Sequence, residues 1–152
     1  MNGVTLSSTA LSGYYHGELP AAVPPGSPLD LRVSARGLIV EARGKVPDVP
    51  VLTAPATAAV FAPGGSITVS WTSPTDPDRF AVYVNTNQPV WNRELPGTAR
   101  ELAVAASELP AGSDLMISVV AYNDGSFTGP AHPDSRMGIM SVADPRVITI
   151  NR

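Results

Sequence analysis

The sequence contains no cysteine among its 152 residues. Disulfide bonds, cysteine-ligated zinc, thioether-linked haem and a thiol nucleophile are therefore all excluded. Histidine is also scarce, since His16 and His132 are the only two present. Because these two lie far apart along the chain, they offer no zinc-binding spacing. We expect this protein to need no cofactor.

Charged residues are few. They make up 15% of the chain, whereas a typical soluble protein has about 25%. Ten residues are basic, of which only Lys45 is a lysine, and they form no run. A nucleic-acid groove or an anionic membrane surface would require clustered lysine and arginine, so we expect neither as a partner. A surface low in charge and rich in hydroxyl groups favours an extracellular or cell-surface location.

Long hydrophobic runs are missing too. No stretch approaches the roughly 20 apolar residues of a membrane-spanning helix, so we expect no membrane insertion. Residues 1–15 have neither a charged start nor a long apolar run, and they do not resemble a secretory signal. If the protein is exported, we expect its signal to lie outside this sequence.

The chain also lacks the apolar spacing of a helix, and its 16 prolines and 13 glycines interrupt it at short intervals. Alternation takes its place. In residues 66–71, Ile67, Val69 and Trp71 alternate with serine and threonine, which is the pattern of a half-buried strand. Alternation also predicts strands at residues 79–85, 98–109 and 146–151, and residues 115–123, which are apolar on both faces, predict a central strand. Turn-forming sequences separate these segments, as in an all-β antiparallel sandwich.

The first 50 residues have a different organisation. Residues 28–46 alternate on both sides of a central Ser-Ala-Arg-Gly turn and predict a β-hairpin. A further strand is predicted at residues 13–19, and residues 46–55 are read as a linker or an edge strand. We therefore divide the chain into a hairpin-rich region, 1–50, and a sandwich, 51–152. The first region is too small for its own core, so we expect it to pack on the sandwich or on a neighbouring chain.

From about residue 50 onward the chain resembles a fibronectin type III or closely related immunoglobulin-like domain. The segment APGGSITVSW matches the second strand with Trp71 as the core tryptophan, and SPTDPDRFAVYVN matches the following loop and third strand. The segment ELPAGSDLMISVVAYNDG matches the approach to the sixth strand. The chain departs from the family at Leu115, where a tyrosine is expected, and in the long segment 126–145. The resemblance implies a spacer or binding module of a bacterial-type surface or secreted protein.

Catalytic patterns are weak. There is no G-x-S-x-G sequence, and a serine hydrolase site would have to use His132 with Asp134, two residues apart. That spacing in an Ala-His-Pro-Asp-Ser loop is more typical of a solvated turn. We expect no catalytic residues and no enzyme activity.

Several aspartates fall in predicted loops, namely Asp76, Asp78, Asp124 and Asp134. Carboxylates that meet at one end of a sandwich can bind Ca²⁺, so the first three are weak calcium candidates. The sequences Thr-Asp-Pro-Asp and Asn-Asp-Gly are also ordinary turn formers, in which aspartate accepts hydrogen bonds from its own backbone. The turn role is the favoured interpretation, and we expect no metal.

Trp91 is the best candidate for a ligand site, because sugar-binding modules stack aromatic rings against the apolar faces of sugars. Asn92 and Arg93 follow it directly and could donate hydrogen bonds, and Tyr83 is a second ring. These four residues define a carbohydrate-binding hypothesis. The alternative is that Trp91 packs over an edge of the sandwich.

The leading functional hypothesis is a non-catalytic structural or adhesive module of an extracellular or cell-surface protein, which contacts neighbouring domains or subunits. In one version the β-prone residues 1–20 join adjacent subunits by strand addition. The runner-up is the carbohydrate-binding module around Trp91.

Overall fold

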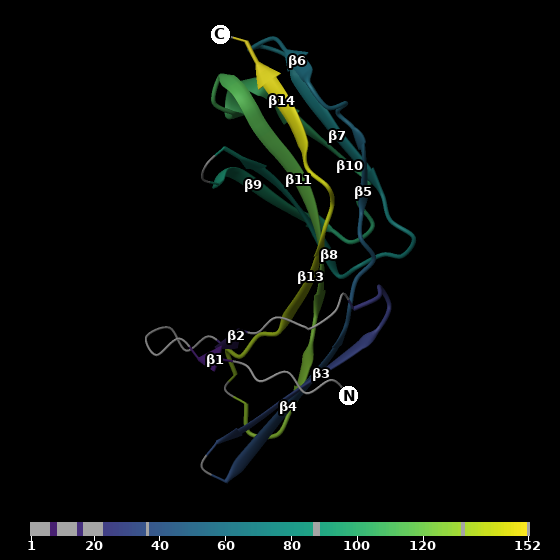
Figure 1. Cartoon of the computed structure of the whole chain (residues 1–152), viewed down its shortest axis with the longest axis vertical. Coiled ribbons are helices and arrows are strands. Elements are labelled where there is room, and N and C mark those ends of the chain that lie inside the picture. The colour runs from purple at the N-terminus through teal and green to yellow at the C-terminus, as the bar shows by residue number, and fades with distance from the viewer. Residues whose placement is uncertain are drawn as a thin grey trace.

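The structure is a computed structural model, and it describes residues 7–8, 15–16, 23–35, 37–86, 89–131 and 133–151. Within these ranges the chain forms β-strands and one short 3₁₀ turn, η1 (Ala106–Glu108). The molecule is elongated, with a layered body at one end and a long hairpin that extends away from it at the other (Figure 1). The all-β prediction is confirmed. In the described part of the chain, no helix has the length and hydropathy needed to cross a bilayer.

Two sheets face each other across the body. The smaller sheet has the order β10-β7-β5 and consists of β5 (Val51–Ala54), β7 (Ser66–Thr72) and β10 (Glu101–Ala105). The larger sheet has the order β6-β14-β11-β8-β9 and consists of β6 (Ala59–Phe61), β8 (Arg79–Asn85), β9 (Pro89–Pro96), β11 (Gly112–Asp124) and β14 (Arg146–Ile150). A sixth strand, β13 (Gly138–Val142), pairs with the last residues of β11.

The core of the body is built around Trp71. Its side chain is 2% exposed, and its ring meets that of Phe80 edge to face at a centroid distance of 5.4 Å. Such a pair contributes about 1 kcal/mol beyond the area it buries. Ile67 and Val69 are buried beside it on β7, as their alternation predicted. Leu115, which replaces the expected tyrosine, is buried in the same cluster. The prediction of a sealed core tryptophan is confirmed.

The strand predictions at residues 66–71, 79–85, 115–123 and 146–151 are confirmed by β7, β8, β11 and β14. The predicted strand 98–109 is confirmed over residues 101–105, which form β10; residues 106–108 form η1 instead, where the N–H of Leu109 bonds the carbonyl of Ala106 at 3.2 Å. Strand β9 was not predicted. Prolines at both its ends and three consecutive polar residues conceal its alternation.

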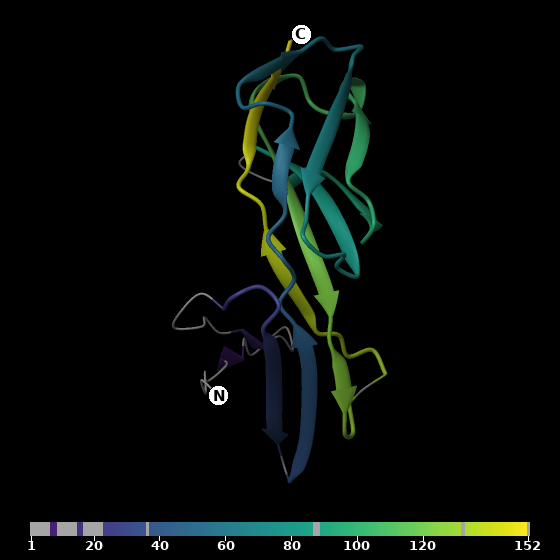
Figure 2. The same cartoon turned by 90° about the vertical axis from the view of Figure 1, so that its right-hand side faces the viewer.

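The hairpin is confirmed as β3 (Pro28–Ala35) and β4 (Leu38–Lys45). It is joined by β12 (Ser126–Thr128), so the order of this second structural unit is β12-β4-β3. After Gly125 the path of β11 continues into β12, and one ribbon passes from the body into the hairpin sheet (Figure 2). A segment of the predicted 51–152 region thus belongs to the sheet built by the predicted 1–50 region.

Two further predictions concern the ends of the first region. Residues 46–55 contain the edge strand β5. Within the predicted strand 13–19, only β2 (Tyr15–His16) is described, and it pairs with β1 (Ser7–Ser8). The rest of that prediction lies outside the described residues.

The junction between hairpin and body is closely packed. The side chain of Asn123 donates to the carbonyl of Lys45 at 2.9 Å and accepts from the N–H of Asp78 at 3.2 Å. The hydroxyl of Ser141 donates to the carbonyl of Pro47 at 2.8 Å. Hydrogen bonds from two strands of the larger sheet therefore hold the chain that leaves β4.

Apolar contacts complete this junction. Ala42, Val46 and Ile139 are buried there although they lie outside the main core cluster. The space beside Gly44 is filled by the side chain of Ile139, so a larger residue would meet it directly. These contacts fix the position of the hairpin relative to the body.

Replacing Gly125 should loosen the junction. A Cβ at this position would lie 2.7 Å from the sulfur of Met137 and 3.0 Å from its Cβ. We expect Gly125→Ala to lower the free energy of unfolding by about 1–3 kcal/mol, measured by urea denaturation. Gly138→Ala is the matched control, because a Cβ there would meet nothing within 4 Å. Equal losses in both variants would contradict this account of the junction.

Candidate functional site

In the described part of the chain, the outer face of the larger sheet carries a connected group of polar side chains. Residues that alternate with the core positions point away from it. On β8 these are Arg79, Ala81 and Tyr83, and on β11 they include Val120 and Tyr122. The register places Arg79 opposite Tyr122 and Ala81 opposite Val120.

The two tyrosines form a bridge across this face. Their hydroxyl oxygens lie 2.9 Å apart, although Tyr83 and Tyr122 stand on either side of the Ala81–Val120 row. The rings must therefore pass over the two smaller residues. This explains why Ala81 is 1% exposed and Val120 is 5% exposed outside the main core cluster.

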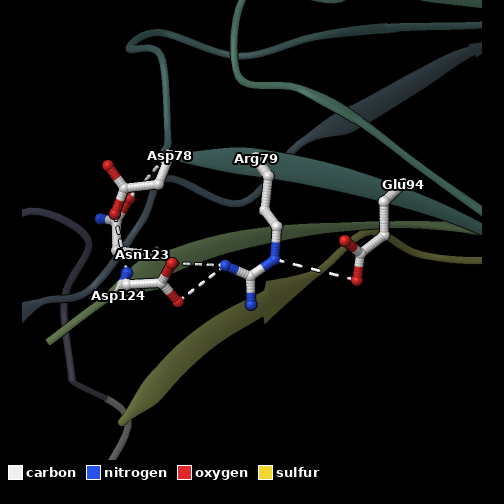
Figure 3. A network of polar contacts seen from close by, with 5 residues as sticks. All are labelled: Asp78, Arg79, Glu94, Asn123 and Asp124. Atoms are coloured by element: carbon white, nitrogen blue, oxygen red, sulfur yellow. Dashed lines mark hydrogen bonds and ion pairs between the residues drawn. The ribbon is translucent and has the colours of Figure 1, made fainter. Parts of the chain in front are cut away.

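Arg79 extends the group beyond the tyrosines. Its guanidinium carbon lies 4.9 Å from the centre of the Tyr122 ring, which is the geometry of a cation–π contact. One guanidinium nitrogen donates to both carboxylate oxygens of Asp124, at 2.7 and 2.6 Å, and Nε lies 4.0 Å from Glu94 (Figure 3). The hydrogen bond to Asp124 raises the pKa of Arg79, and the charges of Asp124 and Glu94 act in the same direction. The Arg79 guanidinium on β8 is thus held by groups of β9 and β11.

Burial raises the pKa of Tyr122 to about 12, and the hydrogen bond with Tyr83 contributes to the shift. Arg79 acts in the opposite direction but does not offset these effects. Tyr122 therefore stays a neutral phenol well into the alkaline range, and it is not poised to serve as a base near neutral pH.

The loop aspartates proposed as calcium ligands are engaged in other contacts. Asp78 accepts a hydrogen bond from the backbone N–H of Asp124 at 2.7 Å, which links the start of β8 to the end of β11. The Asp124 carboxylate binds Arg79, and Asp76 forms an ion pair with Arg100. Across the described residues, no group of three potential ligands could hold a metal ion.

An open hollow lies where the hairpin meets this polar group. The hairpin contributes one wall and the two strand ends contribute the other; its lining residues are Arg43, Gly44, Lys45, Asp78, Asn123 and Asp124. Basic side chains thus face acidic ones across it. The hollow has a volume of about 380 Å³ and is open to solvent.

Trp91 lies on the other side of the sheet. It is opposite Val84, a core residue, and packs half-buried against the core. Its Nε1 donates to Glu108 at 3.4 Å, and Arg93, which covers the indole at 5.2 Å, also binds Glu108 at 3.2 Å. These contacts close the gap between β9 and η1.

The four residues of the carbohydrate hypothesis are therefore divided between two faces. Trp91 and Arg93 lie toward the inner side at the edge of the sandwich, whereas Asn92 is opposite Tyr83 on the outer face. Tyr83 instead meets Tyr122, which the sequence reasoning missed together with Arg79. Arg79 and Tyr122 lie at outward-facing positions of their strands, and only the pairing of β8 with β11 shows that they meet.

The remaining candidates add little to this site. His132 lies outside the described residues, and Asp134 has an interaction of its own. No protein-family model matches this chain, and no curated protein is detectably similar to it.

The pKa of Tyr122 predicts a specific loss of stability in alkali. In the unfolded chain a tyrosine ionises at about pH 10, whereas Tyr122 in the fold ionises at about 12. Between these values the unfolded chain releases the proton first, so the free energy of unfolding falls as the pH rises. Below pH 10 the contribution is fully present. We expect Tyr122→Phe to flatten this part of the pH profile, measured by chemical denaturation.

Tyrosinate absorbance provides the matching readout. One late-titrating phenol should vanish in Tyr122→Phe and should titrate earlier in Tyr83→Phe, which lacks the bridging hydroxyl. An alkaline titration unchanged by Tyr122→Phe would contradict the assignment.

Proposed function

We propose that this chain is a non-catalytic structural module, in which a fibronectin III-like sandwich carries a rigidly seated β-hairpin sheet. It spaces and presents surfaces to neighbouring domains or subunits of an extracellular or cell-surface protein. The observation that carries this proposal is the continuous path from β11 into β12. One ribbon belongs to both sheets, so the hairpin cannot swing without breaking strand pairing or the junction contacts.

The strand order supports the fibronectin III-like part of the proposal. Leaving aside the three-residue β6, the second, third and sixth strands of the sandwich are β7, β8 and β11. These are the strands that the sequence resemblance assigned to the same positions. The additional strands β12 and β13 come from the long segment 126–145, where the chain departs from that family.

The polar group on the outer face supports a structural role as well. Arg79, Asp124, Tyr83 and Tyr122 each bond another member of the group, and these bonds connect β8 to β11. Exposed ion pairs of this kind contribute about 0–1 kcal/mol each, so their effect is mainly to fix side-chain positions. Side chains that are already bound to each other form a stable surface for contacts with a neighbour.

The rigid-module proposal predicts a single distance between hairpin and body. Because the chain has no cysteine, a pair of spin labels can be attached through Thr128→Cys, on β12, and Ser107→Cys, on η1. Both positions are exposed. We expect one narrow distance distribution by pulsed electron paramagnetic resonance, which should broaden when Gly125→Ala is added. A broad distribution without that change would reject the rigid spacer.

A carbohydrate-binding function is the second candidate, and the tyrosine bridge is the observation that favours it. Two rings lie across the outer face of the larger sheet, with Asn92 and Glu94 on the neighbouring strand. Such a face could stack against sugar rings and bond their hydroxyl groups. Trp91 and Arg93 would form a separate contact at the edge.

A glycan panel distinguishes the two functions. The structural proposal predicts no saturable change in tryptophan fluorescence with any glycan. Glycan binding to the variants can be measured by calorimetry. If Tyr83→Ala abolishes saturable binding and Trp91→Ala retains it, the sugar site lies on the outer face. The reverse result would assign it to the edge at Trp91.

A further inference from the structure

Strand β3 is the most regular free edge in the described part of the chain. Among the described residues its one partner is β4, which it pairs through eight consecutive residue pairs from Pro28–Lys45 to Ala35–Leu38 without a bulge. A long edge of this kind exposes a row of unpaired N–H and C=O groups and is a template for another strand.

The other described edges are shorter or interrupted. Strands β6 and β12 have three residues each, and β10 and β13 have five. Strand β5 has a register shift between Leu52 and Ala54, and β9 begins and ends with proline and has a shift of its own. Proline and bulges are devices that protect an edge from pairing. The sequence of β3 has only its first residue, Pro28, in this class.

The free backbone groups of β3 can be assigned from the hydrogen bond of a single residue pair. The N–H of Val46 bonds the carbonyl of Ser27 at 3.0 Å, at the base of the hairpin. In antiparallel pairs the bonded positions recur at every second residue. Leu29, Leu31 and Val33 therefore bond toward β4, and Asp30 and Arg32 direct their N–H and C=O groups to the open edge.

We propose that two copies of this chain associate through antiparallel pairing of β3 with β3, about a two-fold axis at Leu31. In this register Asp30 lies opposite Arg32 of the second copy, and Arg32 lies opposite the second copy's Asp30. These are the positions with free backbone groups, so ladder hydrogen bonds form where the opposite charges meet. The two hairpin sheets become one continuous sheet of six strands.

The charges favour this register over its neighbours. Within one chain, Oδ1 of Asp30 already lies 3.2 Å from Nε of Arg43. Similarly, Nε of Arg32 lies 3.9 Å from Oε1 of Glu41. Pairing about Leu31 joins these into rows that alternate in sign across the interface. Moving the axis to Asp30 would oppose two aspartates, and moving it to Arg32 would oppose two arginines, both of which are unfavourable.

The apolar face matches in the same arrangement. Leu31 lies opposite Ala42, which lies opposite Phe127, so these three form a row on one side of the hairpin sheet. The two-fold axis brings Leu31 against its counterpart and Leu29 against the second copy's Val33. Leu31 is only half-buried in a single chain, so pairing removes further apolar surface from water.

Two single substitutions test this pairing with a built-in rescue. Asp30→Lys places lysine opposite arginine in its own dimer, and Arg32→Glu places glutamate opposite aspartate. We expect the unmodified chain to dimerise with rising concentration in analytical ultracentrifugation and each variant to be monomeric. In an equimolar mixture both charge pairs are again complementary, so the dimer should return. Recovery by mixing cannot come from misfolded chains.

Glu101→Lys on β10 is the matched control, because it makes the same change in charge at an exposed position far from β3 in sequence, and it should leave the dimer intact. A monomeric unmodified chain at all concentrations, or variants that still dimerise, would overturn the proposal. So would folded variants that fail to associate when mixed. The inference builds on the proposed structural role, but a monomer would leave the spin-label test of the rigid spacer untouched.

Discussion

The whole architecture depends on the pairing of β11. This strand of 13 residues pairs with β8 along one edge and with β14 and then β13 along the other. Its inward residues, among them Leu115 and Val119, fill the core beneath Trp71, and its outward residue Tyr122 anchors the outer face. Beyond Gly125 the same path supplies β12 to the hairpin sheet. Core, outer face and hairpin are thus fixed by one strand.

The outer face and the junction show two ways of satisfying polar groups near a sheet. On the outer face, side chains from three strands bind one another, and the tyrosine pair covers a row of small residues. At the junction, Asn123 accepts at its amide oxygen from the N–H of Asp78, just before β8, and donates from its amide nitrogen to the carbonyl of Lys45, the last residue of β4. In each place a polar group near the strand ends has a defined partner, and this favours one arrangement of the elements.

The local pattern of the sequence identified most of the longer strands, though not β9, and it could not identify their partners. Strand β7 is buried on one side only, so its alternation identified both the strand and the inward position of Trp71. Strand β11 is apolar on both faces, and its periodicity could not assign Tyr122 to the outer one. The pairing of Tyr83 with Tyr122 joins residues 39 apart in sequence, and such contacts follow from sheet order. The pairing of Phe127 with the hairpin is another contact between residues distant in sequence. In addition, β12 has only three residues, too few to show a strand pattern.

The last strand has a consequence for how the body would respond to tension. Strand β14 lies between β11, to which it is antiparallel, and β6, to which it is parallel. Its ladder hydrogen bonds on both sides lie across the strand direction. A pull along β14 from its Ile150 end would therefore strain many of these bonds together in shear, and they would not open one after another like a zipper. A body that is loaded in this way resists extension far better than one whose terminal strand peels from an edge.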